Sequence, residues 1–352
     1  MSASRFLRQL VCFATTATLV ALFCVQFVQA QQQQPTNISV DDSDRSAAQQ
    51  AQNVYRHARP ISTPHSRDDF NKINPSAAAN RFHHNFGGNR SVRYPADLEF
   101  NGGNTIHYTQ HHAVFVNTSS ACPANGCWGN PIRFLRDLGK SDFIHVVDQY
   151  TGDYADNRYT VGDAFTINYP VTPGKPLTDT DMETIAYSIE KHTGQSGYEQ
   201  FVHVFLPPGQ DICFDSSDSV CYSPDNLPTW FFCAYHGSFD SDLGHTVYSV
   251  EPYQNVSGCN VGPNTPNGQL ADSTNSVLSH EVFEAITDPD GDAWWNTLNN
   301  GLYGQEIGDE CSFLLFTPNA VYFDPSIVKL DDHFYAAQPE YNNNKHACTT
   351  RS

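Results

Sequence analysis

The spacing of hydrophobic residues predicts two helices in the middle of the chain. Asn130 followed by Pro131 is typical of a helix start, because asparagine caps the free amides and proline fits the first turn. Thr180 and Glu183 have the spacing of a capping box, and apolar residues recur at helical intervals from there to Gly194. These apolar residues are Met182, Ile185, Ala186 and Ile189.

Short apolar runs before and after these helices predict buried strands. Pro207 and Gly209 would end one strand, and Pro289 would end a third helix over 277–288. Helices and strands mixed in this order predict an α+β fold, with a mixed sheet packed on helices in one domain over 96–352. The four runs are 105–116, 199–206, 229–235 and 246–250.

The first thirty residues, 1–30, have the pattern of a secretory signal peptide. Arg5 and Arg8 precede an apolar stretch over 9–28, and the residues ending in Ala30 fit the small-x-small rule for cleavage. An uncleaved signal anchor is the alternative, because the stretch approaches membrane-spanning length. With cleavage no stable membrane span remains, and the sequence predicts a secreted, extracellular protein.

The next segment, 31–95, is polar, and its first half is rich in Gln, Asn, Asp and Ala. It carries too few apolar residues to bury a core of its own. The sequence therefore predicts a disordered leader, which is either a propeptide or a linker.

Cysteine content supports an oxidising compartment. Of the ten cysteines, two lie in the predicted signal peptide, and the remaining even number is typical of a disulfide-bonded secreted protein. Proximity in sequence suggests the pairs Cys122–Cys127 and Cys213–Cys221, with the other four cysteines closing longer loops. N-x-[ST] sequons predict N-glycosylation at Asn37, Asn89, Asn117 and Asn255.

The formal net charge of the chain is −19. This acidity excludes binding of nucleic acid or of an anionic membrane through bulk charge. It is compatible with cation binding but names no ligand, and the oligomeric state is not predicted.

Residues with catalytic potential are concentrated in the predicted helix over 277–288. At about 100° per residue, His280, Glu281 and Glu284 share one arc of that helix, and apolar residues form the opposite stripe. Ligands at positions i and i+4 can bind one zinc ion, and a glutamate directly after the first ligand can accept a proton from the activated water. His280 and Glu284 are thus candidate ligands and Glu281 the candidate base. Because Glu284 stands where a second histidine is usual, calcium is the alternative to zinc.

Two acidic residues further along complete the predicted site. Glu306 follows Glu284 by twenty-two residues, which is enough chain for a second element to return to the helix. Glu306 would supply the third ligand and Asp309 would support a ligating histidine, or the two would exchange roles. An acidic, solvated helix face without a metal is the alternative.

Other histidines give a weaker signal. His236, beside Cys233 and Gly237, would either line the cleft and stabilise an oxyanion or be a buried structural histidine. His111 and His112 lie in a predicted strand, where a structural role is more typical than metal binding. A serine nucleophile is not indicated, because the G-x-S-x-G motif is lacking in the sequence.

These motifs resemble those of two related groups of secreted proteins. One is the plant phosphate-induced, or EXORDIUM-like, family, and the other is a set of bacterial and fungal proteins regarded as zincin-like metallopeptidases. The resemblance covers roughly residues 98–348. The shared pieces, in chain order, are Asn101-Gly102-Gly103, 204–209, 233–239, His280-Glu281-x-x-Glu284-Ala285-x-Thr287-Asp288-Pro289, Trp294 or Trp295, Glu306-Ile307-x-Asp309-x-Cys311, and 338–343.

The resemblance implies a zincin-like fold, in which a mixed sheet packs on the active-site helix, and a zinc-dependent peptidase acting on a peptide or protein substrate. His280, Glu284 and Glu306 would hold zinc with Asp309 in support. The plant members often carry Asn where Asp288 stands, and they are associated with cell-wall and growth signalling. The alternative function is therefore a catalytically silent extracellular protein that binds a cell-wall or matrix component on the same scaffold.

Overall fold

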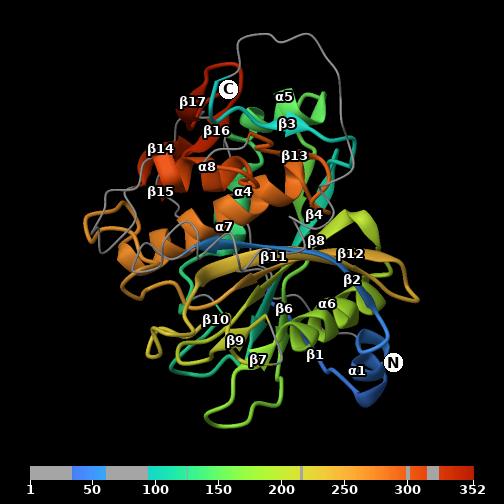
Figure 1. The fold of residues 1–352 in the computed structure, drawn as a ribbon. Coiled ribbons are helices and arrows are strands. Elements are labelled where there is room, and N and C mark those ends of the chain that lie inside the picture. The colour runs from blue at the N-terminus through green and yellow to red at the C-terminus, as the bar shows by residue number, and fades with distance from the viewer. Residues whose placement is uncertain (1–33, 61–93, 125, 215–216, 299–301, 315–324) are drawn as a thin grey trace, which may run out of the picture. The chain divides into compact units, whose positions relative to one another are not determined.

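The protein is built around a mostly parallel central sheet, seen in a computed structural model that describes residues 34–60, 94–124, 126–214, 217–298, 302–314 and 325–352 (Figure 1). The strands of this sheet are β1 (Thr36–Ile38), β2 (Gln52–Pro60), β4 (Thr109–Val116), β5 (Tyr159–Val161), β6 (Phe165–Ile167), β8 (Gly197–Phe205), β11 (Phe232–Asp240) and β12 (His245–Glu251). Their order is β1-β6-β4-β8-β12-β11-β2, with β5 beside β4. Among the described pairs of this sheet, β12–β11 and β11–β2 are antiparallel and the others are parallel.

Smaller sheets and helices surround this sheet. The small strands are β3 (Glu99–Phe100), β7 (Leu177–Thr178), β9 (Ile212–Cys213), β10 (Cys221–Tyr222), β13 (Trp294–Trp295), β14 (Ser326–Leu330), β15 (His333–Ala337), β16 (Glu340–Asn342) and β17 (Ala347–Thr349). The helices are α1 (Asp42–Ala48), α4 (Pro131–Leu138), η1 (Ile144–Val147), α5 (Asp148–Thr151), α6 (Asp179–Thr193), α7 (Gln269–Thr287) and α8 (Ile307–Leu314). The predictions of mixed helical and strand structure and of a mixed sheet are confirmed.

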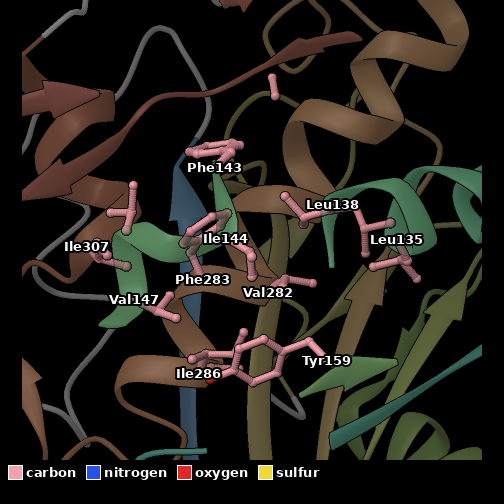
Figure 2. Close-up of a cluster of buried hydrophobic side chains, with 14 of the residues drawn as sticks. Leu135, Leu138, Phe143, Ile144, Val147, Tyr159, Val282, Phe283, Ile286 and Ile307 are labelled. Carbon is pink, nitrogen blue, oxygen red and sulfur yellow. The ribbon is translucent and has the colours of Figure 1, made fainter. Parts of the chain in front are cut away.

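Two hydrophobic layers cover the two faces of the sheet, because side chains alternate along each strand. Phe201 and Phe205 of β8 join the layer around α7, whereas Val202 and Val204 join the layer around α6. Figure 2 shows the first layer, in which Val282, Phe283 and Ile286 of α7 pack with residues of α4 and η1. The helix with the candidate chemistry is thus held by one of the two main cores.

The predicted helix ends are partly confirmed. Asn130 caps α4 by accepting a hydrogen bond from the Arg133 amide, and Gly194 ends α6 in the left-handed conformation at φ 69°. The capping box of α6 is formed by Thr178 and Asp181, so the prediction of Thr180 and Glu183 was wrong by two positions. Glu183 instead accepts a hydrogen bond from the Asn53 side chain on β2.

The prediction of a disordered leader over 31–95 is wrong for residues 34–60. This segment forms β1, α1 and β2, and β2 pairs along its length with β11. Ala58 of β2 is fully buried in the core layer around α6. The backbone pairing compensates for the low apolar content of the segment. The predicted signal peptide and residues 61–93 lie outside the described residues.

Four disulfides stabilise the fold, as expected for a protein of an oxidising compartment. Cys122–Cys127 and Cys213–Cys221 are paired as predicted. The longer closures are Cys233–Cys259 and Cys311–Cys348, and the latter fixes the end of the chain to α8. Within the described ranges, no helix combines the length and the apolar character needed to cross a membrane.

Candidate metal centre

Helix α7 carries three of the predicted site residues toward the sheet. His280, Glu281 and Glu284 are fully buried, and His280 Nε2 lies 3.1 Å from Glu284 Oε1. The other side of the helix places Val282 and Ile286 in the hydrophobic layer (Figure 2). The predicted division of the helix into a polar arc and an apolar stripe is therefore confirmed.

Helix α7 also begins eight residues earlier than predicted, at Gln269. Its first turns are polar, but Asp272 and Ser273 are fully buried and bonded to the chain before them. Asp272 accepts hydrogen bonds from Asn267, and Ser273 accepts one from the Val261 amide. Buried polar residues that are paired in this way do not produce the apolar spacing from which a helix is predicted.

Helix α8 returns the downstream acids to α7. The backbone N–H of Asp309 donates to Glu284 Oε1 at 3.0 Å, and Asp309 Oδ1 lies 3.7 Å from His280 Nε2. Gly308 permits this approach, because a Cβ at that position would lie 2.4 Å from His280 Nδ1. The two helices therefore bring their carboxylates together at one point.

Strand β11 adds His236, which is fully buried. Its Nδ1 lies 3.4 Å from Glu281 Oε2 and 3.7 Å from Glu284 Oε2, and its Nε2 lies 3.8 Å from Glu306 Oε2. Neither ring nitrogen has a side-chain hydrogen-bond partner among the described residues, and the Asp288 backbone lies beside the ring. Burial lowers the pKa of His236 to about 3, so its ring is neutral at physiological pH. All the site residues predicted from the sequence thus lie in one cluster.

Strand β2 contributes two further residues that the sequence did not reveal. The Tyr55 hydroxyl donates to Glu306 Oε1 and lies 3.1 Å from His57 Nδ1. His57 Nε2 lies 2.5 Å from Asp309 Oδ2. The available signal was the alternation of Tyr55, His57 and Arg59, which places all three on one face of a strand.

Two groups of ligand atoms are close enough to hold a cation. One comprises His57, Glu284 and Asp309, the other His236, Glu281 and Glu284, and within each group the atoms lie within 4.8 Å of one another. Both Glu281 oxygens, Glu284 Oε2 and Asp309 Oδ1 have no hydrogen-bond partner in the described part of the chain. Because a buried charge needs a partner, carboxylate oxygens in this arrangement favour a cation beside them.

The hydrogen bonds of Gln338 determine which ring nitrogen of His280 carries the proton. Its Oε1 accepts from the guanidinium of Arg59 and from Ser312 Oγ, and its Nε2 donates to the Gly308 carbonyl at 2.7 Å. This sets the orientation of the amide, so the same Nε2 donates to His280 Nδ1 at 2.9 Å. Burial lowers the pKa of His280 well below its ordinary value. The neutral ring therefore carries its proton on Nε2.

The cluster is strongly acidic. Arg59 is the only arginine or lysine among the buried residues that the structure describes, and burial lowers its pKa to about 10, so it remains charged at neutral pH. Burial, together with the neighbouring carboxylates, raises the pKa of Glu281 and of Glu284 well above the ordinary value. The buried acids of the cluster are Glu251, Glu281, Glu284, Glu306, Asp309 and Glu340. A divalent cation would relieve this imbalance.

His111, considered above as a weak metal candidate, belongs to a buried chain of hydrogen bonds that ends at Glu251. Its Nδ1 lies 2.8 Å from His203 Nε2, His203 Nδ1 lies 2.8 Å from Ser249 Oγ, and Ser249 donates to Glu251 at 2.9 Å. Burial lowers the pKa of His111 to about 3. The neighbouring His112 bonds to the Asp163 carbonyl and to Gln195. Both histidines therefore have structural partners.

Comparison with known proteins adds no assignment. Neither family models, nor curated proteins, nor solved structures gave a match to the chain. The resemblance to zincin-like and EXORDIUM-like proteins therefore rests on the sequence motifs alone.

Proposed function

We propose that the chain is a secreted zinc-dependent peptidase with a zincin-like packing of its sheet on α7. The observation that carries the proposal is the group of buried carboxylate oxygens on Glu281, Glu284 and Asp309 that lack hydrogen-bond partners within the described residues. Buried carboxylate oxygens without hydrogen-bond partners cost free energy, and a cation with a reacting water beside them would compensate that cost.

The chemistry of the donors fits zinc better than calcium. Each group of ligand atoms combines one imidazole with two carboxylates. Imidazole suits zinc and similar transition metals, whereas calcium takes six to eight oxygen ligands. Three protein ligands also leave a coordination position open, as in catalytic zinc sites.

The side chains divide into holding and reacting roles. Glu284 and Asp309 would hold the cation together with an imidazole, and the cation would supply Lewis acidity and lower the pKa of water. Glu281 accepts the proton from the attacking water, for which its unpartnered oxygens and raised pKa suit it. His236, 3.4 Å from Glu281 Oε2, steadies the charge that develops on the substrate.

The alternative is a catalytically silent extracellular protein that binds a cell-wall or matrix component. One observation favours it: every ligand candidate in the cluster is fully buried. Closed sites are typical of structural metal ions, whereas catalytic ions keep an accessible position. The two functions share the cation and differ in whether a substrate reaches it.

A peptide-hydrolysis assay separates them. The zinc-loaded wild type should cleave a peptide library, lose activity with a chelator and regain it with zinc. Glu281→Gln should keep its zinc and lose about 10²–10⁴-fold in turnover, because the amide cannot accept the proton. The matched control is Glu199→Gln on an exposed part of β8, which should retain activity. A zinc-loaded, folded wild type that cleaves no peptide would leave the silent alternative.

A further inference from the structure

We infer that His57 of β2, and not His280 of α7, is the imidazole ligand of the cation. His280 is then a positioning residue for Glu284. The inference rests on the proposed function only in requiring a cation at the cluster. It changes the ligand set that the sequence motif implies, and it assigns part of the site to the N-terminal segment.

The hydrogen bonds of Gln338 oppose a ligand role for His280. To bind a cation through Nε2, the neutral ring would have to carry its proton on Nδ1. That proton would then point at the Gln338 amide nitrogen, 2.9 Å away, which is itself a donor. Rotating the amide by 180° would place its oxygen against the Gly308 carbonyl at 2.7 Å and its nitrogen against the Arg59 guanidinium. Both arrangements leave buried groups of like polarity in contact.

His57 differs from His280 because its Nδ1 faces hydrogen-bond acceptors rather than a donor. Tyr55 donates its hydroxyl proton to Glu306, so the Tyr55 oxygen accepts from His57 Nδ1 at 3.1 Å. Nδ1 also lies 3.3 Å from Glu306 Oε1, so its two neighbours hold the ring with Nε2 directed at Asp309 Oδ2, 2.5 Å away. A proton shared by these two atoms holds them at that distance, and a cation bound by Glu284 and Asp309 would replace that proton on Nε2, because metal ligands bind in the deprotonated form. Tyr55 and Glu306 thus orient a metal-binding histidine as outer partners commonly do.

The remaining ligands lie on the same side of His57. The nitrogen of His57 and oxygens of Glu284 and Asp309 are within 4.8 Å of one another. Asp309 Oδ1 and Glu284 Oε2 are fully buried and lack hydrogen-bond partners among the described residues. The three residues come from β2, α7 and α8, so the site is complete only when residues 34–60 remain part of the folded protein.

The test is zinc affinity, measured by competition with a chelating dye, and the absorption spectrum of the cobalt-substituted protein. His57→Gln should lower zinc affinity by clearly more than the roughly 10–100-fold that is usual for a supporting residue, and it should change the cobalt spectrum. His280→Gln should lower affinity by roughly 10–100-fold, the usual contribution of a supporting residue, and leave the cobalt spectrum unchanged. His112→Gln, a buried histidine of β4 outside the cluster, is the matched control and should bind zinc like the wild type.

A rescue variant keeps the test decisive if a single substitution impairs folding. In Gln338→Glu a protonated carboxyl oxygen would donate to the Gly308 carbonyl and accept from His280 Nδ1; this would turn Nε2 into a ligand and should restore part of the affinity lost in His57→Gln. Tight zinc binding by His57→Gln together with loss of binding by His280→Gln would overturn the inference but leave the proposed function standing. A folded wild type that binds no zinc would instead contradict the proposed function itself.

Discussion

Replacing Glu251 with glutamine should stabilise the metal-free protein, and increasingly so as the pH rises. Glu251 is fully buried; its Oε1 accepts from Ser249 Oγ at 2.9 Å, and its Oε2 has no hydrogen-bond partner among the described residues. Burial raises its pKa to about 8. Glutamine keeps the size and the acceptor but never ionises, so Glu251→Gln removes the cost of placing this charge in the interior.

The direction and the size of this pH dependence of stability follow from proton linkage. Because the pKa of Glu251 is higher in the folded than in the unfolded state, its favourable contribution is complete below about pH 4 and is lost as the pH rises toward and through 8. The loss is about 2 kcal/mol at pH 6 and about 5 kcal/mol at pH 9, at 1.36 kcal/mol per pKa unit. The stability advantage of Glu251→Gln should therefore grow by about 2–3 kcal/mol between these pH values.

Urea unfolding of wild type and Glu251→Gln in the presence of a chelator, at several pH values from 6 to 9, measures this difference. The chelator removes cations that would themselves lower carboxyl pKa values in the cluster. Glu199→Gln on the exposed part of β8 is the control and should follow the wild type at every pH. Parallel stability curves for wild type and Glu251→Gln across this range would refute the conclusion that burial raises the pKa of the Glu251 carboxyl.

Two further predictions concern stability. Arg59→Met should destabilise the metal-free protein by about 3–5 kcal/mol in urea unfolding at neutral pH, because it leaves the buried carboxylates without their arginine; unchanged stability would show that these carboxyls are neutral without it. Replacing Cys311 and Cys348 together by alanine opens a loop of 37 residues and should cost about 4 kcal/mol by loop entropy. A loss below about 1 kcal/mol would show that the unfolded chain is constrained in another way.

The sequence was most informative where chemistry and helical spacing coincide. His280, Glu281 and Glu284 were assigned to one face of a helix, and Asp309 was expected to return to it. Both expectations follow from a fixed angle per residue and a sufficient length of chain. The structure agrees on these contacts, and it agrees on both short-range disulfides predicted from proximity.

The sequence was misleading where polar residues are buried in pairs. Residues 52–60 have the composition of a leader, yet β2 lies at the edge of the sheet and buries His57 and Arg59 completely. Strand pairing over more than one hundred residues of separation leaves no local signal in composition. The proton position on His280 was also beyond prediction, because it depends on the hydrogen bonds of Gln338, fifty-eight residues away.

Crystals of the zinc-loaded protein, measured on both sides of the zinc absorption edge, test the central claim most directly. We expect an anomalous peak within the buried cluster, bound by Glu284, Asp309 and His57 Nε2. An empty cluster in crystals that hold zinc elsewhere, or a peak bound to solvent-exposed residues alone, would contradict the assignment of this cluster as the metal centre.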